Sequence, residues 1–242
     1  MADNRMTGAQ RVLDANGNVL LDGVWCPARM LEILGTPKCG DWLGRTVLDI
    51  GGNTGGLSLE LARRGAIVTL VEPDPLGRSL ARSRKLLDEQ VERESLHLNI
   101  VESDLFGCHK LPRHEIILFL GLVYHFRYPQ YCLDYLSTLE PKELFVSSQT
   151  YESKALVLAN RLNEGFMRPD QFPSSIPIAG FHPSHSMLRV MLEAAGFDEL
   201  VMLTDREYCA PEKPFPDVTN SAYYRAQFKR RLDPEQEKKR FL

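Results

Sequence analysis

The chain has 242 residues, of which 43% are hydrophobic and 25% are charged, and its formal net charge is -3. This composition is typical of a globular protein with one large domain or two small ones. It gives no global attraction to nucleic acid or acidic membranes, and no apolar run approaches the roughly 20 residues that a membrane span needs.

The N-terminus and the cysteines together predict a cytoplasmic protein with reduced thiols. The first ten residues, MADNRMTGAQ, contain no apolar stretch of the kind that secretory signals carry. The cysteines are odd in number, lie far apart and form no CxxC pair, which argues against a disulfide framework or a zinc cage. They are Cys26, Cys39, Cys108, Cys132 and Cys209.

Residues 1–45 are too short for a domain and are expected to form an N-terminal extension, with a hairpin turn at Asn16-Gly17. From Thr46 onward, short apolar runs alternate with helical patterns, and such runs are typical of parallel strands buried on both faces. The expected strands are Val47–Ile50, Ile67–Val71, Leu96–Val101, Ile116–Leu120 and Leu144–Ser147. This alternation predicts an α/β fold with a doubly wound, Rossmann-like sheet.

Helical patterns fill the gaps between these runs. Leu57 and Leu61 share one helix face that ends before Gly65, and Leu76, Leu80 and Leu87 mark a second helix. A third helix begins at Pro129 and ends before Pro141. Further along, Ser184 and Ser186 are candidate N-caps for a helix that Gly196 closes. The last two runs, Glu199–Thr204 and Tyr223–Lys229, have no helical pattern between them and are expected to pair antiparallel.

The stretch from Val47 to Asp74, VLDIGGNTGGLSLELARRGAIVTLVEPD, places a glycine-rich turn after the first strand and an acid, Glu72, after the second. In an open α/β sheet, ligands bind beyond the carboxyl ends of the strands. The glycines let the backbone approach a ligand, and the following helix offers free N–H groups. A dinucleotide site needs G-x-G-x-x-G, and the middle glycine is Asn53 here, which disfavours NAD. A tight turn without any ligand is the other interpretation.

The motif VLDIGGNTGG resembles the first motif of class I S-adenosylmethionine-dependent methyltransferases, in its asparagine-containing variant. The resemblance covers about Thr46 to Arg230 and implies a seven-stranded sheet whose last strand pair is antiparallel. It also implies that the glycine turn holds the methionine part of S-adenosylmethionine, that Glu72 binds the ribose hydroxyls, and that Asp104 binds the adenine amino group. The cofactor residues expected from it are Asp49, Gly51, Gly52, Asn53, Gly55, Glu72, Pro73, Asp104, Leu105, Leu120 and Gly121.

Two segments, GRTVLDIGG and LGLVYHFRYP, are similar to the bacterial family that carboxymethylates the wobble uridine of tRNA with carboxy-S-adenosylmethionine. In that family, the positions matched by Tyr124 and Arg225 help to hold the extra carboxylate. The upstream lysine of that family has no counterpart here, and residues 1–45 are shorter than its N-terminal extension. We therefore expect a structural kinship and ordinary S-adenosylmethionine as the donor.

His125 follows the fourth strand of the domain and is the candidate general base for an acceptor that arrives protonated. Tyr124 is its candidate partner at the catalytic edge. A transferable methyl mainly needs an aligned nucleophile, so the alternative is that both side chains only pack or hold the cofactor.

An insertion at 151–183 is expected to form a substrate lid beside this edge, because a loop of this size is seldom an ordinary connection. Its aromatic residues favour a small, partly apolar organic acceptor. The candidate substrate-binding residues are Tyr151, Phe166, Phe181, His182 and Arg225. We expect no metal, since the histidines show no acid–histidine spacing.

The sequence predicts a methyltransferase domain at 46–230 and a charge-mixed, solvated tail at 231–242 that needs no nucleic acid to explain it. Its expected reaction is methyl transfer to an oxygen or nitrogen of a small organic molecule. Two alternatives stay open: a tRNA wobble-uridine (carboxy)methyltransferase, and a cofactor-binding partner protein that has lost catalysis. The oligomeric state and the identity of the acceptor do not follow from the sequence.

Overall fold

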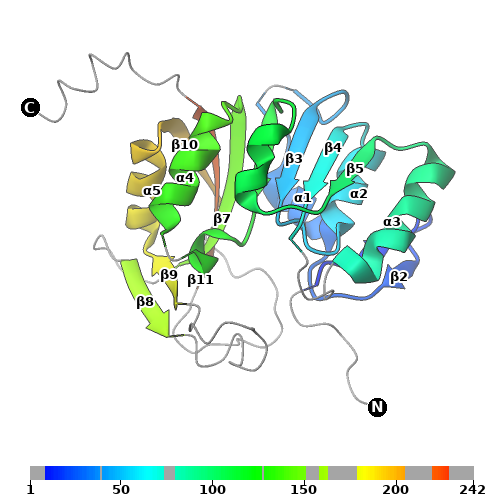
Figure 1. The fold of residues 1–242 in the computed structure, drawn as a ribbon, viewed down its shortest axis with the longest axis horizontal. Coiled ribbons are helices and arrows are strands. Elements are labelled where there is room, and N and C mark those ends of the chain that lie inside the picture. The colour runs from blue at the N-terminus through cyan, green and yellow to red at the C-terminus, as the bar shows by residue number, and fades with distance from the viewer. Residues whose placement is uncertain are drawn as a thin grey trace, which may run out of the picture.

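A computed structural model of the chain describes residues 9–38, 40–73, 80–126, 128–150, 158–162, 179–204 and 220–228. A seven-stranded sheet forms the centre, in the order β10-β11-β7-β6-β3-β4-β5 (Figure 1). Its strands are β3 (Thr46–Ile50), β4 (Ile67–Val71), β5 (Leu98–Val101), β6 (Ile116–Phe119), β7 (Glu143–Thr150), β10 (Phe197–Thr204) and β11 (Asn220–Phe228).

The pairing confirms the predicted fold class. Strands β7, β6, β3, β4 and β5 run parallel, whereas β11 pairs antiparallel with both β7 and β10. The chain moves outward from β3 to β4 and β5, and then returns to place β6 on the other side of β3. The switch point therefore lies between β3 and β6, where ligands of open α/β sheets bind. Strand β7 is longer than the predicted run Leu144–Ser147, since it begins at Glu143 and ends at Thr150.

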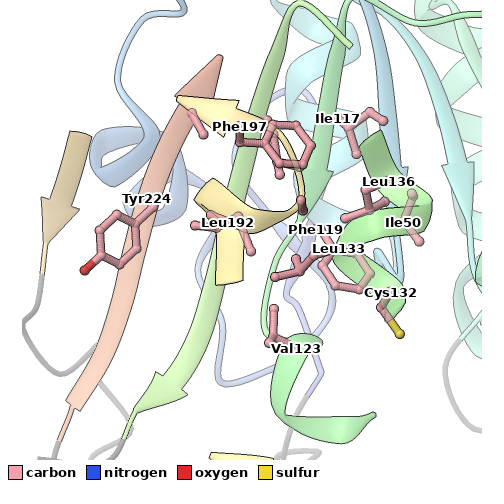
Figure 2. Close-up of a cluster of buried hydrophobic side chains, with 14 of the residues drawn as sticks. Ile50, Ile117, Phe119, Val123, Cys132, Leu133, Leu136, Leu192, Phe197 and Tyr224 are labelled. Carbon is pink, nitrogen blue, oxygen red and sulfur yellow. The ribbon is translucent and has the colours of Figure 1, made fainter. Parts of the chain in front are cut away.

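Helices cover both faces of this sheet. On one face, α4 (Pro129–Thr138) and α5 (His185–Ala194) pack on β3, β6 and β7. Figure 2 shows this core, in which Phe119, Leu133 and Leu192 lie between the sheet and the two helices. On the other face, α1 (Pro27–Leu34) and α2 (Gly56–Arg63) share a core with residues of β3, β4, β6 and β7. Helix α3 (Leu80–Glu94) contributes Leu80 and Leu87 to a smaller third cluster.

The predicted helix ends agree with the local geometry. Gly65 has φ +85° just after α2, and the side chain of Ser184 caps α5 by accepting a hydrogen bond from the N–H of Met187 at 3.2 Å. Leu76, predicted to lie in α3, is outside the described residues, as is the tail at 231–242.

The N-terminal residues pack onto the sheet domain. Strands β1 (Val12–Leu13) and β2 (Val19–Leu21) form the expected hairpin, with Gly17 in the left-handed region at φ +83°. Val12 is fully buried beside Leu59 and Leu70, and α1, which the sequence analysis did not predict, packs against α2. This segment is part of the same hydrophobic core.

The region predicted as a lid contains an antiparallel hairpin of β8 (Leu158–Leu162) and β9 (Ala179–Pro183), separate from the main sheet. Strand β9 packs against β7 and against the short 3-10 helix η2 (Val123–His125). The hairpin thus lies beside the residues that follow β6 (Figure 1). Among the described residues, no helix is both long enough and apolar enough to cross a membrane.

Candidate active site

The glycine turn follows β3 at the switch point of the sheet. Gly51, Asn53 and Gly55 all have positive φ, at +70°, +57° and +76°. Asparagine tolerates this left-handed backbone better than most residues, and the Oδ1 of Asn53 accepts a hydrogen bond from the N–H of Thr54 at 2.8 Å. The asparagine at the middle position of the motif therefore has a local structural reason.

The other demand for glycine in this turn comes from close packing. A Cβ on Gly52 would lie 2.3 Å from Leu70 and 2.7 Å from the Oδ2 of Asp49, and one on Gly51 would lie 2.5 Å from Leu122. Leu122 belongs to the loop after β6, so the loops that leave β3 and β6 touch each other at the switch point. Gly51 and Gly52 are therefore needed for close packing of the turn against Asp49, Leu70 and Leu122.

Asp49, on β3, is buried beneath the turn and accepts a hydrogen bond from the hydroxyl of Ser58 at 2.6 Å. Burial disfavours its charged form and raises its pKa to about 6, while the hydrogen bond from Ser58 opposes that shift. A carboxyl group with a pKa of about 6 therefore lies beneath the glycine turn.

Glu72 follows β4 and reaches back to the turn. Its Oε2 accepts a hydrogen bond from the N–H of Asn53 at 2.9 Å, and its own N–H donates to the carbonyl of Val101 at 3.2 Å. The predicted turn and the predicted ribose-binding acid are thus in direct contact across 19 residues. Pro73, also predicted here, follows it and is exposed.

Asp104 and Leu105 lie after β5, the next strand. Asp104 is the N-cap of a 3-10 helix, η1 (Leu105–Lys110), and its Oδ1 accepts a hydrogen bond from the N–H of Gly107 at 2.9 Å. Leu105 is buried in the core beneath α4. The cap fixes an exposed carboxylate at the same edge of the sheet as Glu72.

Leu120 and Gly121 complete the edge after β6. Gly121 has φ +72°, and its N–H donates to both the carbonyl and the hydroxyl of Ser147, at 3.1 and 2.8 Å. Leu120 packs against the core beneath α1 and α2. Gly121 also faces Tyr124, whose hydroxyl lies 3.9 Å from where a glycine Cβ would be.

Three rings meet where η2 touches β9. The ring centroids of Tyr124 and His125 are 4.2 Å apart, and those of Tyr124 and His182 are 5.4 Å apart with the rings stacked. Burial, and secondarily the nearby His182, lowers the pKa of His125 to about 4. His125 is therefore neutral at physiological pH.

The remaining predicted substrate residues do not all join this cluster. Tyr151 and Phe166 lie outside the described residues, and of Phe181 only the backbone is described, paired with Asn160 in the hairpin. Arg225 lies elsewhere: its Nε is 3.4 Å from the buried Glu143, and its Nη1 donates to the carbonyl of Thr36 at 3.2 Å. Glu143 begins β7, so Arg225 is near the end of the sheet opposite the glycine turn.

Two glutamines near the site have no counterpart in the sequence analysis. The side-chain Oε1 of Gln10 accepts the hydrogen bond of the Leu57 N–H at 2.8 Å, so one of the helix donors expected to be free for a ligand is occupied by the protein. Gln149, near the end of β7, has an enclosed Oε1 with no hydrogen-bond partner in the described part of the chain. Neither residue belongs to a motif, so no sequence signal pointed to them.

The described ranges contain no group of three or more histidine, cysteine, aspartate or glutamate side chains able to hold a metal ion.

Comparison with known proteins shows the fold. No protein-family model matches the sequence, and no curated protein sequence is significantly similar to it. The N-terminal domain of EvdMO1, solved in the presence of S-adenosylhomocysteine and D-fucose, superposes with a TM-score of 0.64 at 17% identity, covering 92% of each chain. The same domain with S-adenosylhomocysteine bound gives a TM-score of 0.61 at 18% identity, over 84% of this chain and 79% of that one.

Two further solved structures carry the same architecture. Magnesium protoporphyrin IX methyltransferase from Synechocystis, with S-adenosylmethionine bound, has a TM-score of 0.54 at 16% identity, over 84% of this chain and 77% of that one. The 1,6-didemethyltoxoflavin-N1-methyltransferase of Burkholderia thailandensis has a TM-score of 0.53 at 16% identity, over 84% and 76%. The chain therefore has the class I methyltransferase fold, as its glycine motif predicted.

Proposed function

We propose that this chain is an S-adenosylmethionine-dependent methyltransferase that acts on an oxygen or nitrogen of a small organic molecule. The similar structures support the cofactor, because they are described with S-adenosylmethionine or S-adenosylhomocysteine bound. Two of them are named as methyltransferases of small molecules, a porphyrin and a toxoflavin precursor. Fold likeness alone does not fix chemistry, so the site residues have to carry the proposal.

The observation that carries it is the junction of the glycine turn with Glu72 at the switch point. Glu72 accepts the N–H of Asn53, so its carboxylate is fixed at the turn, where a ribose diol would find two acceptor oxygens. Asp104 presents a second carboxylate after the neighbouring strand, suited to an adenine amino group. Two acids and a neutral asparagine in place of the middle glycine fit an adenosyl group better than the pyrophosphate of a dinucleotide.

The chain's own residues suit proton handling at the acceptor. When bound, S-adenosylmethionine supplies a methyl group that its sulfonium already activates. The neutral imidazole of His125 would accept the proton of a hydroxyl or amine acceptor, and Tyr124, whose ring is tilted against His125 and stacked on His182, would orient it. Strand β9 packs against η2, and His182 on it is buried, so an acceptor beside these rings would meet little water.

A small acceptor is favoured by the enclosure of the rings. Tyr124 is 9% exposed and His182 is 3% exposed, so these two rings offer little open surface to a macromolecule. The net charge of -3 likewise supplies no general attraction for the tRNA backbone.

The test is to measure ligand binding and methyl transfer by the full chain. Titration calorimetry should show S-adenosylhomocysteine binding, with NAD as the control that does not bind, and saturating ligand should stabilise the fold by about 3 kcal/mol at 100 times the dissociation constant. Mass spectrometry of ligand retained through purification separates S-adenosylmethionine from its carboxylated analogue. Methyl transfer from labelled donor to pooled phenols, enols and amines then tests for turnover. Binding of NAD alone would overturn the proposal, and cofactor binding without any transfer would favour a non-catalytic partner protein.

A further inference from the structure

The described N-terminal segment contacts the glycine turn and the start of α2 at residues that follow Asn53, the residue that Glu72 contacts. The backbone carbonyl of Gln10 accepts a hydrogen bond from the hydroxyl of Thr54 at 2.6 Å, and the side-chain Oε1 of Gln10 accepts one from the N–H of Leu57 at 2.8 Å. Gln10 is 7% exposed and Thr54 is fully buried. These two bonds span 44 and 47 residues, so tertiary structure brings them together.

Gln10 is itself held in place by backbone pairing. The N–H of Arg11 donates to the carbonyl of Trp25 at 2.8 Å, and the N–H of Trp25 donates to the carbonyl of Ala9 at 3.1 Å. On its other side the segment lies so close to α2 that a Cβ on Gly56 would be 2.1 Å from the carbonyl oxygen of Arg11. The segment is therefore wedged between the stretch before α1 and the start of α2.

The side chain of Gln10 replaces a local helix cap. Helix α2 begins at Gly56 after Gly55, which has no side chain, and Leu57 is in the first turn, where N–H groups have no partner within the helix. Gln10 satisfies this donor from a distant part of the chain. A buried donor left without a partner would favour other conformations of the turn.

We infer that Gln10 is a positioning residue of the cofactor site, an inference that rests on the proposed function. The turn from Gly51 to Gly55 has three residues in the left-handed region, and such a backbone persists when its surroundings determine it. Glu72 holds the turn through the N–H of Asn53, and Gln10 holds the residues that follow, with its backbone carbonyl bound to Thr54 and its side chain to the N–H of Leu57. Gln10 thereby preorganises the turn for the methionine part of the cofactor without touching the ligand.

Gln10→Met and Gln10→Glu test this inference, with Kd for S-adenosylhomocysteine as the readout. Methionine keeps the length of the side chain but removes the acceptor, and Kd should rise roughly tenfold, the worth of one satisfied buried donor. Glutamate keeps an acceptor oxygen, and its charge suits a helix N-terminus, so Kd should return to within about threefold of the parent value. An unchanged Kd in folded Gln10→Met protein would overturn the inference.

Two controls separate positioning from a general loss of stability. Arg11→Ala removes a partly exposed ion pair with Asp22 from the same segment and should leave Kd unchanged. Leu192→Val truncates the core on the opposite face of the sheet, so it should lower Tm and leave Kd unchanged. If Leu192→Val raised Kd as much as Gln10→Met does, stability alone would explain the effect and the inference would fail.

A second variant and a second readout cover a Gln10→Met protein that does not fold. Thr54→Val removes only the hydroxyl that donates to Gln10 and should raise Kd about threefold or more. Hydrogen exchange is measured on the ligand-free protein. In Gln10→Met, the N–H of Leu57 should exchange faster. In Thr54→Val, which keeps the bond from Leu57 to Gln10, residues 51–55 should exchange faster. Unaltered exchange in every folded variant contradicts the inference. Failure of the parent chain to bind S-adenosylhomocysteine would instead contradict the proposed function.

Discussion

The two halves of the candidate active site are built in different ways. The cofactor half consists of the glycine turn, Glu72 and Asp104, and it is held by backbone N–H groups that donate to carboxylates at the ends of neighbouring strands. The acceptor half consists of Tyr124, His125 and His182, and it is held by ring contacts between a loop of the sheet domain and a separate hairpin.

This difference has a physical consequence. Backbone bonds and positive φ values tie the cofactor half to strand ends, which every protein of this fold must form. Side-chain contacts tie the acceptor half to an inserted hairpin, so its composition can change without disturbing the sheet. Mutations in the cofactor half should therefore weaken cofactor binding, and mutations in the acceptor half should lower the rate of methyl transfer. The predictions below test this division.

The largest expected effect is on turnover in the acceptor half. His125→Ala should slow methyl transfer by about 10²–10⁴-fold, the usual contribution of positioned proton transfer, and leave the affinity for S-adenosylhomocysteine nearly intact. Tyr124→Phe is the matched control, because it keeps the ring stack on His182. It should change the apparent KM for the donor or the acceptor more than it changes kcat. Near-normal turnover of His125→Ala between pH 6 and 9 would reduce His125 to a packing residue.

The next effect is on stability in the cofactor half. Burial raises the pKa of Asp49 to about 6 from 3.8, so the folded state holds this proton more tightly, and stability is lost as pH rises through 6. Asp49→Asn removes a buried charge and keeps an acceptor for Ser58, so it should stabilise the fold by about 2–3 kcal/mol at pH 8. Urea unfolding at pH 8 and pH 4 measures this gain, which should fall to about 0.6 kcal/mol at pH 4, close to the unfolded pKa of 3.8.

The same variant should bind S-adenosylhomocysteine more weakly, if the charge beneath the turn serves the cofactor. Stability and binding would then change in opposite directions, as expected for a strained functional site. An equal gain at both pH values would show that the Asp49 carboxyl does not titrate as its burial implies.

A smaller effect is expected for the carboxylate that contacts the turn. Glu72→Ala should weaken binding of S-adenosylhomocysteine by roughly 1–3 kcal/mol, through lost charge-assisted bonds to ribose. Glu102, an exposed acid after β5, offers the matched control, and Glu102→Ala should leave calorimetric affinity unchanged. Equal affinities for the two variants would remove Glu72 from the cofactor site.

The sequence predicted where the residues of the proposed cofactor half lie in the fold, because each of them follows a recognisable strand. Asn53 and Glu72 are placed by the ends of β3 and β4, so knowing the strands nearly fixes their contact. Gln10 could not be found this way, because its partners lie 44 and 47 residues away and no pattern in the first ten residues marks it. Long-range pairing of an irregular segment leaves no periodic signal.

Arg225 shows a second limit. Its strand and antiparallel direction were predicted, but its distance from the ligand edge depends on the register between β11 and β7. That register places Arg225 opposite Phe145, beside the buried Glu143 at the start of β7. Register is set by side-chain packing and by the connecting chain, and neither can be read from one strand alone. His182, by contrast, was expected near the catalytic edge, and it stacks on Tyr124.

The smallest expected effect is on the pH dependence of turnover in the physiological range. An ordinary histidine base, with a pKa near 6.5, would lose about half of kcat/KM at pH 6.5 as it becomes protonated. The pKa of His125 is lowered to about 4 by burial and by His182, so its basic form persists and this group should leave kcat/KM flat from pH 8 to about pH 5. Asp49, beneath the glycine turn, has a pKa of about 6, and a decline in kcat/KM near pH 6 that disappears in Asp49→Asn belongs to it. In Asp49→Asn, the remaining decline of kcat/KM should lie near pH 4. His182→Ala should move this decline to higher pH, because His182 is the second cause of the lowered pKa of His125. A limb near pH 6.5 that survives in Asp49→Asn and vanishes in His125→Ala would show that His125 titrates as an exposed base, and that the ring cluster opens to water during turnover.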